Sequence, residues 1–211
     1  MDILVVLENN QGSLHRLSKE AIVGAQMLGD SVSAIVMGSG SGEIAVQLEG
    51  YDLEKVIIVD HELVRSYNAD GYSEVLKQVI ESASPKMIVA GHTYQTRDFM
   101  PRVSAKLEIP FIPDIISLSD DGFIKQILNS KLNAKISSSS GQLILSFQSA
   151  AFSEEDIRSG SCQPEVFDVK LDPTNVRSTS EAPFQEALGD VDLESAEVLV
   201  SVGRGIEKEE N

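Results

Sequence analysis

The side chains best placed for chemistry follow a short apolar stretch in the middle of the sequence. Residues 87–90 are apolar and lead through Gly91 and a polar loop at 92–96 to Arg97 and Asp98. In α/β proteins, ligands and partners gather where a parallel strand ends and the N-terminus of the next helix points outward. The pattern therefore predicts a functional edge here, with a helix that begins near Arg97 and Asp98.

Two kinds of function suit the charged residues of this helix. If Asp98 is the N-cap, Pro101 falls at the third helical position, where its missing N–H costs no hydrogen bond. Arg97 and Arg102 would then lie on the first turns and could bind a nucleotide phosphate, or form ion pairs on a surface that docks another domain or subunit. Because cationic side chains at a helix N-terminus oppose the helix dipole unless an anion is present, the motif alone favours docking.

Other candidates for chemistry are isolated in the sequence. The glycine-rich turn at 38–42 follows a strand and precedes a helix, but it lacks the Gly-Lys-Ser/Thr ending of a phosphate loop, so an ordinary turn is favoured over phosphate binding. His61 stands between Asp60 and Glu62, but no second cluster with ligand spacing accompanies it. Cys162 has no helix or base near it in the sequence, so neither a metal site nor a catalytic nucleophile is expected.

Apolar runs and helical periodicity alternate over the first 90 residues. Strands are expected at 3–7, 32–37, 56–59 and 87–90, and helices at 13–28, from the 38–42 turn to about 48, and at 73–82. Strands that alternate with helices predict a mainly parallel sheet with right-handed crossovers and helices on both faces. The expected fold is therefore α/β and Rossmann-like.

The pattern changes after Pro113. Strands separated by short turns are expected at 123–128, 132–137 and 142–148, and residues 165–171 could form another. This spacing predicts a small antiparallel β-meander, an extension over about 122–171 that is attached to the parallel sheet. Together with the preceding residues it completes an expected N-terminal α/β domain at 1–171.

The last 40 residues have a different composition. Residues 172–194 are rich in Pro, Ser, Thr, Asp and Glu and poor in large apolar groups, which predicts a linker or surface wrap. Residues 195–211 hold a strand-like run and the turn Gly203-Arg204-Gly205, and the chain stops six residues later. This end is interpreted as the first strand and turn of a truncated second domain.

The charge balance narrows the classes of partner. Acidic residues outnumber basic ones by 33 to 17, for a formal net charge of −16. Binding to nucleic acid or to an anionic membrane requires clustered Lys and Arg, so neither is expected. No apolar run approaches the ~18 residues of a membrane span, and a single cysteine fits a reducing compartment. We expect a soluble, cytoplasmic protein.

Three segments resemble the α subunit of electron transfer flavoproteins. The central one matches in order and spacing at Gly91-His92-Thr93, Arg97-Asp98, Pro101-Arg102-Val103, Ala105-Lys106-Leu107 and Asp114-Ile115. Residues 17–38 are similar to the family's first helix and second strand. Residues 200–205, VSVGRG, are similar to the opening of its flavin domain, with Val202 in place of a glycine.

This resemblance implies an adenine-nucleotide-hydrolase-like fold and an electron carrier rather than an enzyme. The implied parent is a heterodimer of α and β subunits that takes electrons from dehydrogenases and passes them through FAD to a quinone oxidoreductase or another acceptor. In the family the flavin sits mainly in a C-terminal domain of the α subunit, which this chain is expected to lack, and AMP lies in the β subunit. No cofactor is therefore expected on this chain alone.

The resemblance also implies a role for the matched residues. The domain would pack against the β subunit and support the mobile flavin domain. Its interface or framework residues would be His92, Thr93, Arg97, Asp98, Arg102, Asp114 and Arg204.

Two alternatives stay open at this point. The chain could be a free-standing adenine-nucleotide-binding domain with sensor or hydrolase activity, which would use the 38–42 turn and Arg97 or Arg102 as phosphate contacts. It could also be a regulatory paralogue that naturally lacks the flavin domain.

Overall fold

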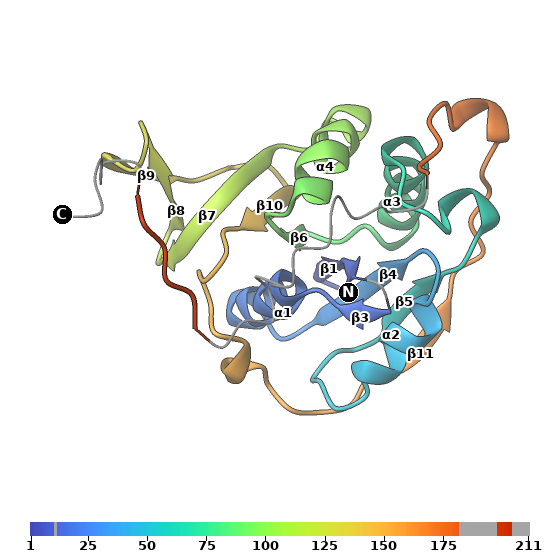
Figure 1. Ribbon diagram of the computed structural model, residues 1–211, viewed down its shortest axis with the longest axis horizontal. Coiled ribbons are helices and arrows are strands. Elements are labelled where there is room, and N and C mark those ends of the chain that lie inside the picture. The colour runs from blue at the N-terminus through green and yellow to red at the C-terminus, as the bar shows by residue number, and fades with distance from the viewer. Residues whose placement is uncertain (11, 182–197, 204–211) are drawn as a thin grey trace. The chain divides into compact units, whose positions relative to one another are not determined.

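The computed structural model describes residues 1–10, 12–181 and 198–203 of the chain (Figure 1). It divides into two units, Met1–Ser180 and Glu181–Asn211. All of the helices and strands described below belong to the first unit. None of the helices in the described ranges is long and apolar enough to cross a membrane.

The first unit is built on one nine-stranded sheet, in the order β11-β5-β4-β1-β6-β10-β7-β8-β9. All neighbours from β11 to β7 are parallel, whereas β7, β8 and β9 pair antiparallel. The strands are β1 (Ile3–Leu7), β4 (Val32–Met37), β5 (Val56–Val59), β6 (Met87–Gly91), β7 (Phe111–Ser119), β8 (Gly122–Ile127), β9 (Leu132–Ile136), β10 (Leu143–Phe147) and β11 (Pro164–Val166). The predicted α/β fold, with a mainly parallel sheet and a small antiparallel extension, is confirmed.

Helices cover both faces of the sheet. They are α1 (Arg16–Leu28), α2 (Ser41–Gln47), α3 (Ala69–Ala83) and α4 (Tyr94–Leu107), with short 3-10 turns η1 (Glu62–Val64), η2 (Glu154–Asp156) and η3 (Pro173–Asn175). One apolar cluster joins the sheet to α1 and α2, and a second joins it to α3 and α4. Figure 1 shows these two helix pairs on opposite sides of the strands.

The last strand of the predicted β-meander belongs to the parallel sheet instead. β10 pairs in parallel with β6 on one side and with β7 on the other. All five of its residues are buried, including Ser146. A run covered on both faces is typical of a central parallel strand, whereas its short spacing from the preceding strand had indicated an antiparallel meander.

Helix beginnings differ most from the sequence prediction. Residues 13–14 form β3 (Ser13–Leu14), which pairs with β2 (Asn9–Asn10), so α1 begins three residues later than expected. α3 begins earlier, at Ala69, because the Asn68 side chain accepts a hydrogen bond from the N–H of Gly71 and caps the helix.

The C-terminal predictions are only partly covered by the described residues. The segment from 167 to 180, here called the return segment, follows β11 and includes η3. Of the expected opening strand at 195–211, only residues 198–203 are described, and these form no strand. The predicted domain boundaries stay predictions.

Candidate functional site

The carboxyl ends of β1 and β6 meet at the middle of the sheet. The chain leaves β1 for β4 on one side and leaves β6 for β10 and β7 on the other, so the strand order reverses between them. Open α/β sheets bind ligands in the crevice at such a switch point. A pocket of about 340 Å³ lies here and is lined by Glu8, His15, Leu17, His92, Thr93, Tyr94 and Arg97. Three of the residues singled out in the sequence thus share one pocket.

His92 is held by hydrogen bonds at the end of β6. Its backbone N–H donates to the carbonyl of Phe147 at 2.7 Å, and its Nδ1 lies 2.8 Å from Oγ of Ser146. Ser146 Oγ also accepts the backbone N–H of Asp114 at 3.3 Å. The tautomer with the ring proton on Nε2 lets the Ser146 hydroxyl donate to Nδ1 while its oxygen accepts the N–H of Asp114, and we assign this tautomer on that ground.

The surroundings favour the neutral form of His92. Burial lowers the pKa of His92, while the carboxylate of Asp114, 4.0 Å from Nε2, acts in the opposite direction. The positive charges of Arg97 and Lys125 lower the pKa further. The net shift is below the ordinary value, so the imidazole is uncharged at neutral pH.

Contacts among Ser146, His92 and Asp114 invite comparison with a hydrolytic triad. Ser146 lies within β10 with 0% of its surface exposed, so no substrate carbonyl can reach its Oγ. Asp114 adopts a left-handed φ of 64° where the register between β7 and β10 shifts. Asp and Asn tolerate this conformation better than most residues. The three residues are therefore a framework that joins β6, β7 and β10, without a nucleophile.

Thr93 caps α4 and holds a carboxylate against it. Its Oγ1 accepts the backbone N–H of Thr96 at 3.1 Å, and its hydroxyl donates to Oε2 of Glu8. Glu8 follows β1 directly, so its charge lies at the positive end of the α4 dipole. Phosphates occupy this position in nucleotide-binding α/β proteins. The chain thus supplies its own anion at the switch point.

The predicted start of α4 is wrong. The helix begins at Tyr94, so Asp98 is not the N-cap and Pro101 is the eighth helical residue. Thr93 becomes the N-cap because its side chain reaches the free N–H of Thr96. Pro101 still cannot bond to the carbonyl of Arg97, but it lies on the exposed side of the helix, where water can replace that bond.

Arg97 points toward solvent at the rim of the pocket. Its guanidinium carbon lies 5.6 Å from the ring centroid of Tyr94, within the range of a cation–π contact. Tyr94 is 88% exposed. Among the described residues Arg97 forms no ion pair, which leaves its charge available to a partner or an anion.

Arg102 and Asp98 belong to a separate network between α3 and α4. Arg102 donates from Nη1 to Asp70 at 3.1 Å and from Nη2 to Asp98 at 3.2 Å. The second oxygen of Asp98 accepts the hydroxyl of Tyr67 at 2.8 Å. Burial, followed by the contact with Asp98, raises the pKa of Tyr67. These contacts tie the two helices together away from the pocket.

The same network holds the return segment. Oδ2 of Asp70, whose side chain is 14% exposed, accepts the backbone N–H of Arg177 at 3.1 Å. The hydroxyl of Ser180 donates to the carbonyl of Tyr67. The return segment thus passes along α3 and ends beside the loop that precedes it.

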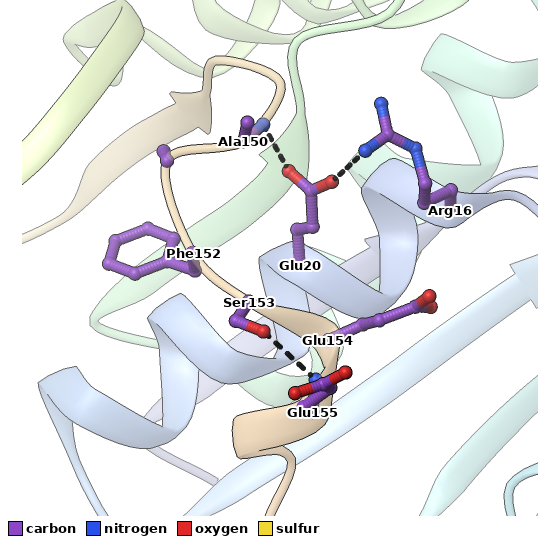
Figure 2. Close-up of a pocket in the computed structure, with 8 residues that line it drawn as sticks. Arg16, Glu20, Ala150, Phe152, Ser153, Glu154 and Glu155 are labelled. Atoms are coloured by element: carbon purple, nitrogen blue, oxygen red, sulfur yellow. Dashed lines mark hydrogen bonds and ion pairs between the residues drawn. The ribbon is translucent and has the colours of Figure 1, made fainter. Parts of the chain in front are cut away.

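A second pocket of about 420 Å³ lies between α1 and the loop after β10 (Figure 2). Glu20 in this pocket accepts the N–H of Ala150 at 2.7 Å and pairs with Nη1 of Arg16 at 3.0 Å. Arg16 also donates to Oγ of Ser149 at 2.8 Å. Figure 2 shows both carboxylate oxygens of Glu20 engaged, so this group clamps the loop to α1 and is not free for a ligand.

The glycine-rich turn at 38–42 behaves as an ordinary turn. The N–H of Gly38 donates to the carbonyl of Val59 and the N–H of Ser39 to that of Arg65, both at 3.1 Å. These amides point into the protein rather than toward a ligand. The geometry of these two residues agrees with the predicted turn.

The remaining candidates are structural or lie outside the described residues. His15 and His61 accept hydrogen bonds from the N–H groups of Leu17 and Leu63, and so begin α1 and η1. Nowhere in the ranges 1–10, 12–181 and 198–203 do three or more His, Cys, Asp or Glu gather as they would around a metal ion. Arg204 lies outside the described residues.

Cys162 is a buried thiol at the edge of the core. Its Sγ donates to the carbonyl of Leu48 at 3.2 Å. Burial, followed by the charge of Glu49, raises the pKa of this thiol. A protonated and buried sulfur fits the prediction that Cys162 is not a nucleophile.

Comparison with known proteins assigns the α/β unit to a family. Residues 3–172 match the family described as "Electron transfer flavoprotein domain". The chain is 31% identical over 217 residues to the electron transfer flavoprotein subunit alpha of Bacillus subtilis, which covers 99% of this chain and 66% of that protein. It is 25% identical to the corresponding subunit of Clostridium acetobutylicum, over 99% of this chain and 66% of the relative.

A third relative carries a different name. The chain is 28% identical over 246 residues to the acryloyl-CoA reductase electron transfer subunit beta of Anaerotignum propionicum, again over 99% of this chain and 66% of the relative. The chain therefore spans about two thirds of the length of the curated relatives that it matches.

Proposed function

Because the chain belongs to the electron transfer flavoprotein family and corresponds to the N-terminal part of its α subunits, we propose that it serves in a heterodimeric electron carrier. The parent would take electrons from dehydrogenases and pass them through FAD to a quinone oxidoreductase or another acceptor. Residues 1–180 would pack against the β subunit and support the flavin-binding part. The family match over residues 3–172 is the observation that carries this proposal.

Two places that could take the pyrophosphate of a flavin dinucleotide are already bonded within the protein. A pyrophosphate needs a helix N-terminus or a glycine-rich turn with free amides. The N-terminus of α4 faces the carboxylate of Glu8 through Thr93, and the amides of Gly38 and Ser39 are bonded to the protein. We therefore assign no redox step to residues 1–180 and propose that the flavin of the parent is bound elsewhere in the heterodimer.

The contacts of His92 and Arg102 support a framework role. His92 is fixed to β10 through Ser146, and Arg102 joins α4 to α3 through Asp70. Rigid elements that hold their surface side chains in place suit a domain that supports a partner. His92, Thr93, Asp98, Arg102 and Asp114 are proposed as framework residues, and Arg97 as a surface contact.

Coexpression with a β subunit tests the proposal. We expect a stable one-to-one complex by size-exclusion chromatography with light scattering, with any AMP in the β subunit. The purified 211-residue chain is expected to show no flavin absorbance. Failure to form the complex, or stoichiometric flavin on the isolated chain, would contradict the proposal.

A second candidate function rests on the pocket at the switch point. Arg97 lies at its rim, and no carboxylate of the described residues pairs with it. An adenine-nucleotide sensor or hydrolase would use this charge for a phosphate. Calorimetry with AMP and ATP separates the two functions, because only this second candidate requires micromolar binding to the isolated chain that Arg97→Ala abolishes.

A further inference from the structure

The hairpin formed by β8 and β9 exposes large apolar side chains at its turn. Ile127, Leu128 and Leu132 are 37%, 67% and 55% exposed. Ile127 and Leu132 are cross-strand partners, and Leu128 begins the turn between them. Side chains of such a pair lie about 5 Å apart. This pair and the adjacent exposed Leu128 are here called the hairpin patch.

The residues around the hairpin patch are basic in a chain that is otherwise strongly acidic. Lys125, Lys131 and Lys135 lie on the hairpin or in its turn, and there is no Asp or Glu between residues 122 and 153. The chain as a whole carries a formal charge of −16. Lys135 is paired with Asp121, and Lys131 forms no ion pair within the described part of the chain. The patch thus combines an apolar centre with a basic surrounding.

The same hairpin ends the sheet. β9 is the last strand in the order, and none of the described strands pairs with its outer side. Figure 1 shows β8 and β9 at the opposite end of the sheet from β5 and β11. An open strand edge offers backbone N–H and C=O groups to another chain, unless a partner or a covering segment protects it.

We propose that the hairpin patch and the open edge of β9 are the docking surface for the β subunit of the heterodimer. The facing surface would have an apolar centre and carboxylates at its rim. This inference rests on the proposed function, because the occupant is the partner subunit named there. It adds the location of the contact and the chemistry of the partner's surface.

Charge argues against a second copy of this chain as the occupant. A two-fold contact between two hairpins would place Lys131 and Lys135 close to the lysines of the other copy, which is repulsive. A contact between the hairpin and an acidic surface elsewhere on a second copy is head-to-tail and leads to a ring or an open chain of copies rather than a closed dimer. A different chain with carboxylates around its contact surface would attract the lysines of the hairpin. It would also form a closed complex of two subunits.

The opposite edge of the sheet provides a matched control. Val166 lies on the edge strand β11 and is 77% exposed. A Val166→Asp variant adds one carboxylate, against two in the paired hairpin variant, to an edge position that is also exposed. The charge of the hairpin is tested separately with Lys131→Glu, which leaves every apolar contact in place.

Titration of the purified chain against the purified β subunit tests the inference. We expect the paired variant Leu128→Asp/Leu132→Asp to bind at least tenfold more weakly, and Val166→Asp to bind like the unmodified chain. Lys131→Glu is expected to slow association and to reduce its dependence on salt. Thermal unfolding of each isolated variant establishes that it is folded.

The other possible results of this titration separate the docking surface from the proposed function. Unchanged binding by the paired variant and by Lys131→Glu would overturn the docking surface while leaving the proposed function intact. Absence of binding by the unmodified chain would overturn the proposed function and the docking surface together. Self-association of the isolated chain that disappears in the paired variant would identify a second copy as the occupant and overturn the inference.

Discussion

His92 owes its charge state to the residues that surround it. Three charged groups act on the imidazole, and burial decides the balance: Asp114 raises the pKa, while Arg97 and Lys125 lower it. Because its folded-state pKa lies below the unfolded value of about 6.5, the unfolded chain takes up the proton first as the pH falls. The contribution of His92 to stability is therefore present above pH 6.5 and is lost as the pH falls through the folded-state pKa.

Two substitutions should move this pKa in opposite directions. Asp114→Asn keeps a residue that tolerates the left-handed backbone and removes the negative charge, so we expect the pKa of His92 to fall further. Arg97→Ala removes a positive charge and should raise it. NMR titration of the histidine Cε1–H resonances measures both shifts, with His61 as the internal reference. If both variants shifted the pKa of His92 in the same direction, Asp114 and Arg97 would not act on it with opposite sign as proposed.

Gly91 is needed where β6 approaches the start of α1. A Cβ at this position would lie 2.6 Å from Cβ of Leu17 and 2.8 Å from its carbonyl oxygen. Because backbone cannot move aside as a flexible side chain can, we expect Gly91→Ala to reduce the free energy of unfolding by about 1–3 kcal/mol. The measurement is urea denaturation.

Gly42 provides the control for this substitution. It lies in α2 with no atom within 4 Å of an added Cβ. Gly42→Ala should therefore be neutral, or stabilising by up to about 1 kcal/mol through helix propensity. A loss of stability at Gly42 equal to that at Gly91 would contradict the steric explanation.

Sequence reasoning found the residues of the pocket that follow β6 but missed their partners. Glu8 has a readable signal, because it is the first polar residue after the apolar run of β1. Ser146 stands within an apolar strand, and only the pairing of β10 with β6 brings it to His92. Glu20 forms an i, i+4 pair with Arg16 that resembles an ordinary surface pair, until the loop after β10 buries it.

At the scale of elements, periodicity predicted which segments form helices and strands better than it predicted where they begin. Four central parallel strands were predicted because continuous apolar runs identify them. The start of α4 was predicted wrongly because Thr93 and Asp98 are both residue types that cap helices well. The contacts of Thr93 with Thr96 and Glu8 make Thr93 the N-cap. The direction of β10 was missed because a short connection to the preceding strand does not specify which strand β10 pairs with.

The capping of α4 can be tested directly. Thr93→Ala removes the acceptor for the N–H of Thr96 and the donor to Glu8, and we expect a loss of about 1 kcal/mol in the free energy of unfolding. Thr93→Ser keeps the hydroxyl and should retain most of the stability. Urea denaturation of the two variants makes the comparison. Equal losses would show that the methyl group of Thr93, rather than its hydroxyl, stabilises the helix start.

At the scale of the whole first unit, the return segment connects β11, the last strand in the sequence, to helix α3. Two hydrogen bonds join Gln78 of α3 to Lys170, and Asp70 accepts the backbone N–H of Arg177. This arrangement fixes the place at which the chain leaves the first unit.

Asp70 is the residue whose loss should release the return segment. In Asp70→Asn the charge-assisted bonds from Arg177 and Arg102 are weakened, and we expect trypsin to cleave after Arg177 about fivefold faster, which corresponds to about 1 kcal/mol. Glu74→Gln is the control, because it removes the partner of Lys106 on the same helix without touching the return segment. Mass spectrometry of timed digests identifies the cleavage site.

The insertion of β10 between β6 and β7 also determines the order in which the sheet can be assembled. During synthesis β7, β8 and β9 leave the ribosome before the strand that connects them to β6. Until residue 147 has emerged, the inner edges of β6 and β7 are both unpaired and apolar. Such non-local pairing slows folding and exposes a nascent chain to aggregation. We therefore expect the nascent chain to be most exposed to aggregation while residues 111 to 142 are being synthesised.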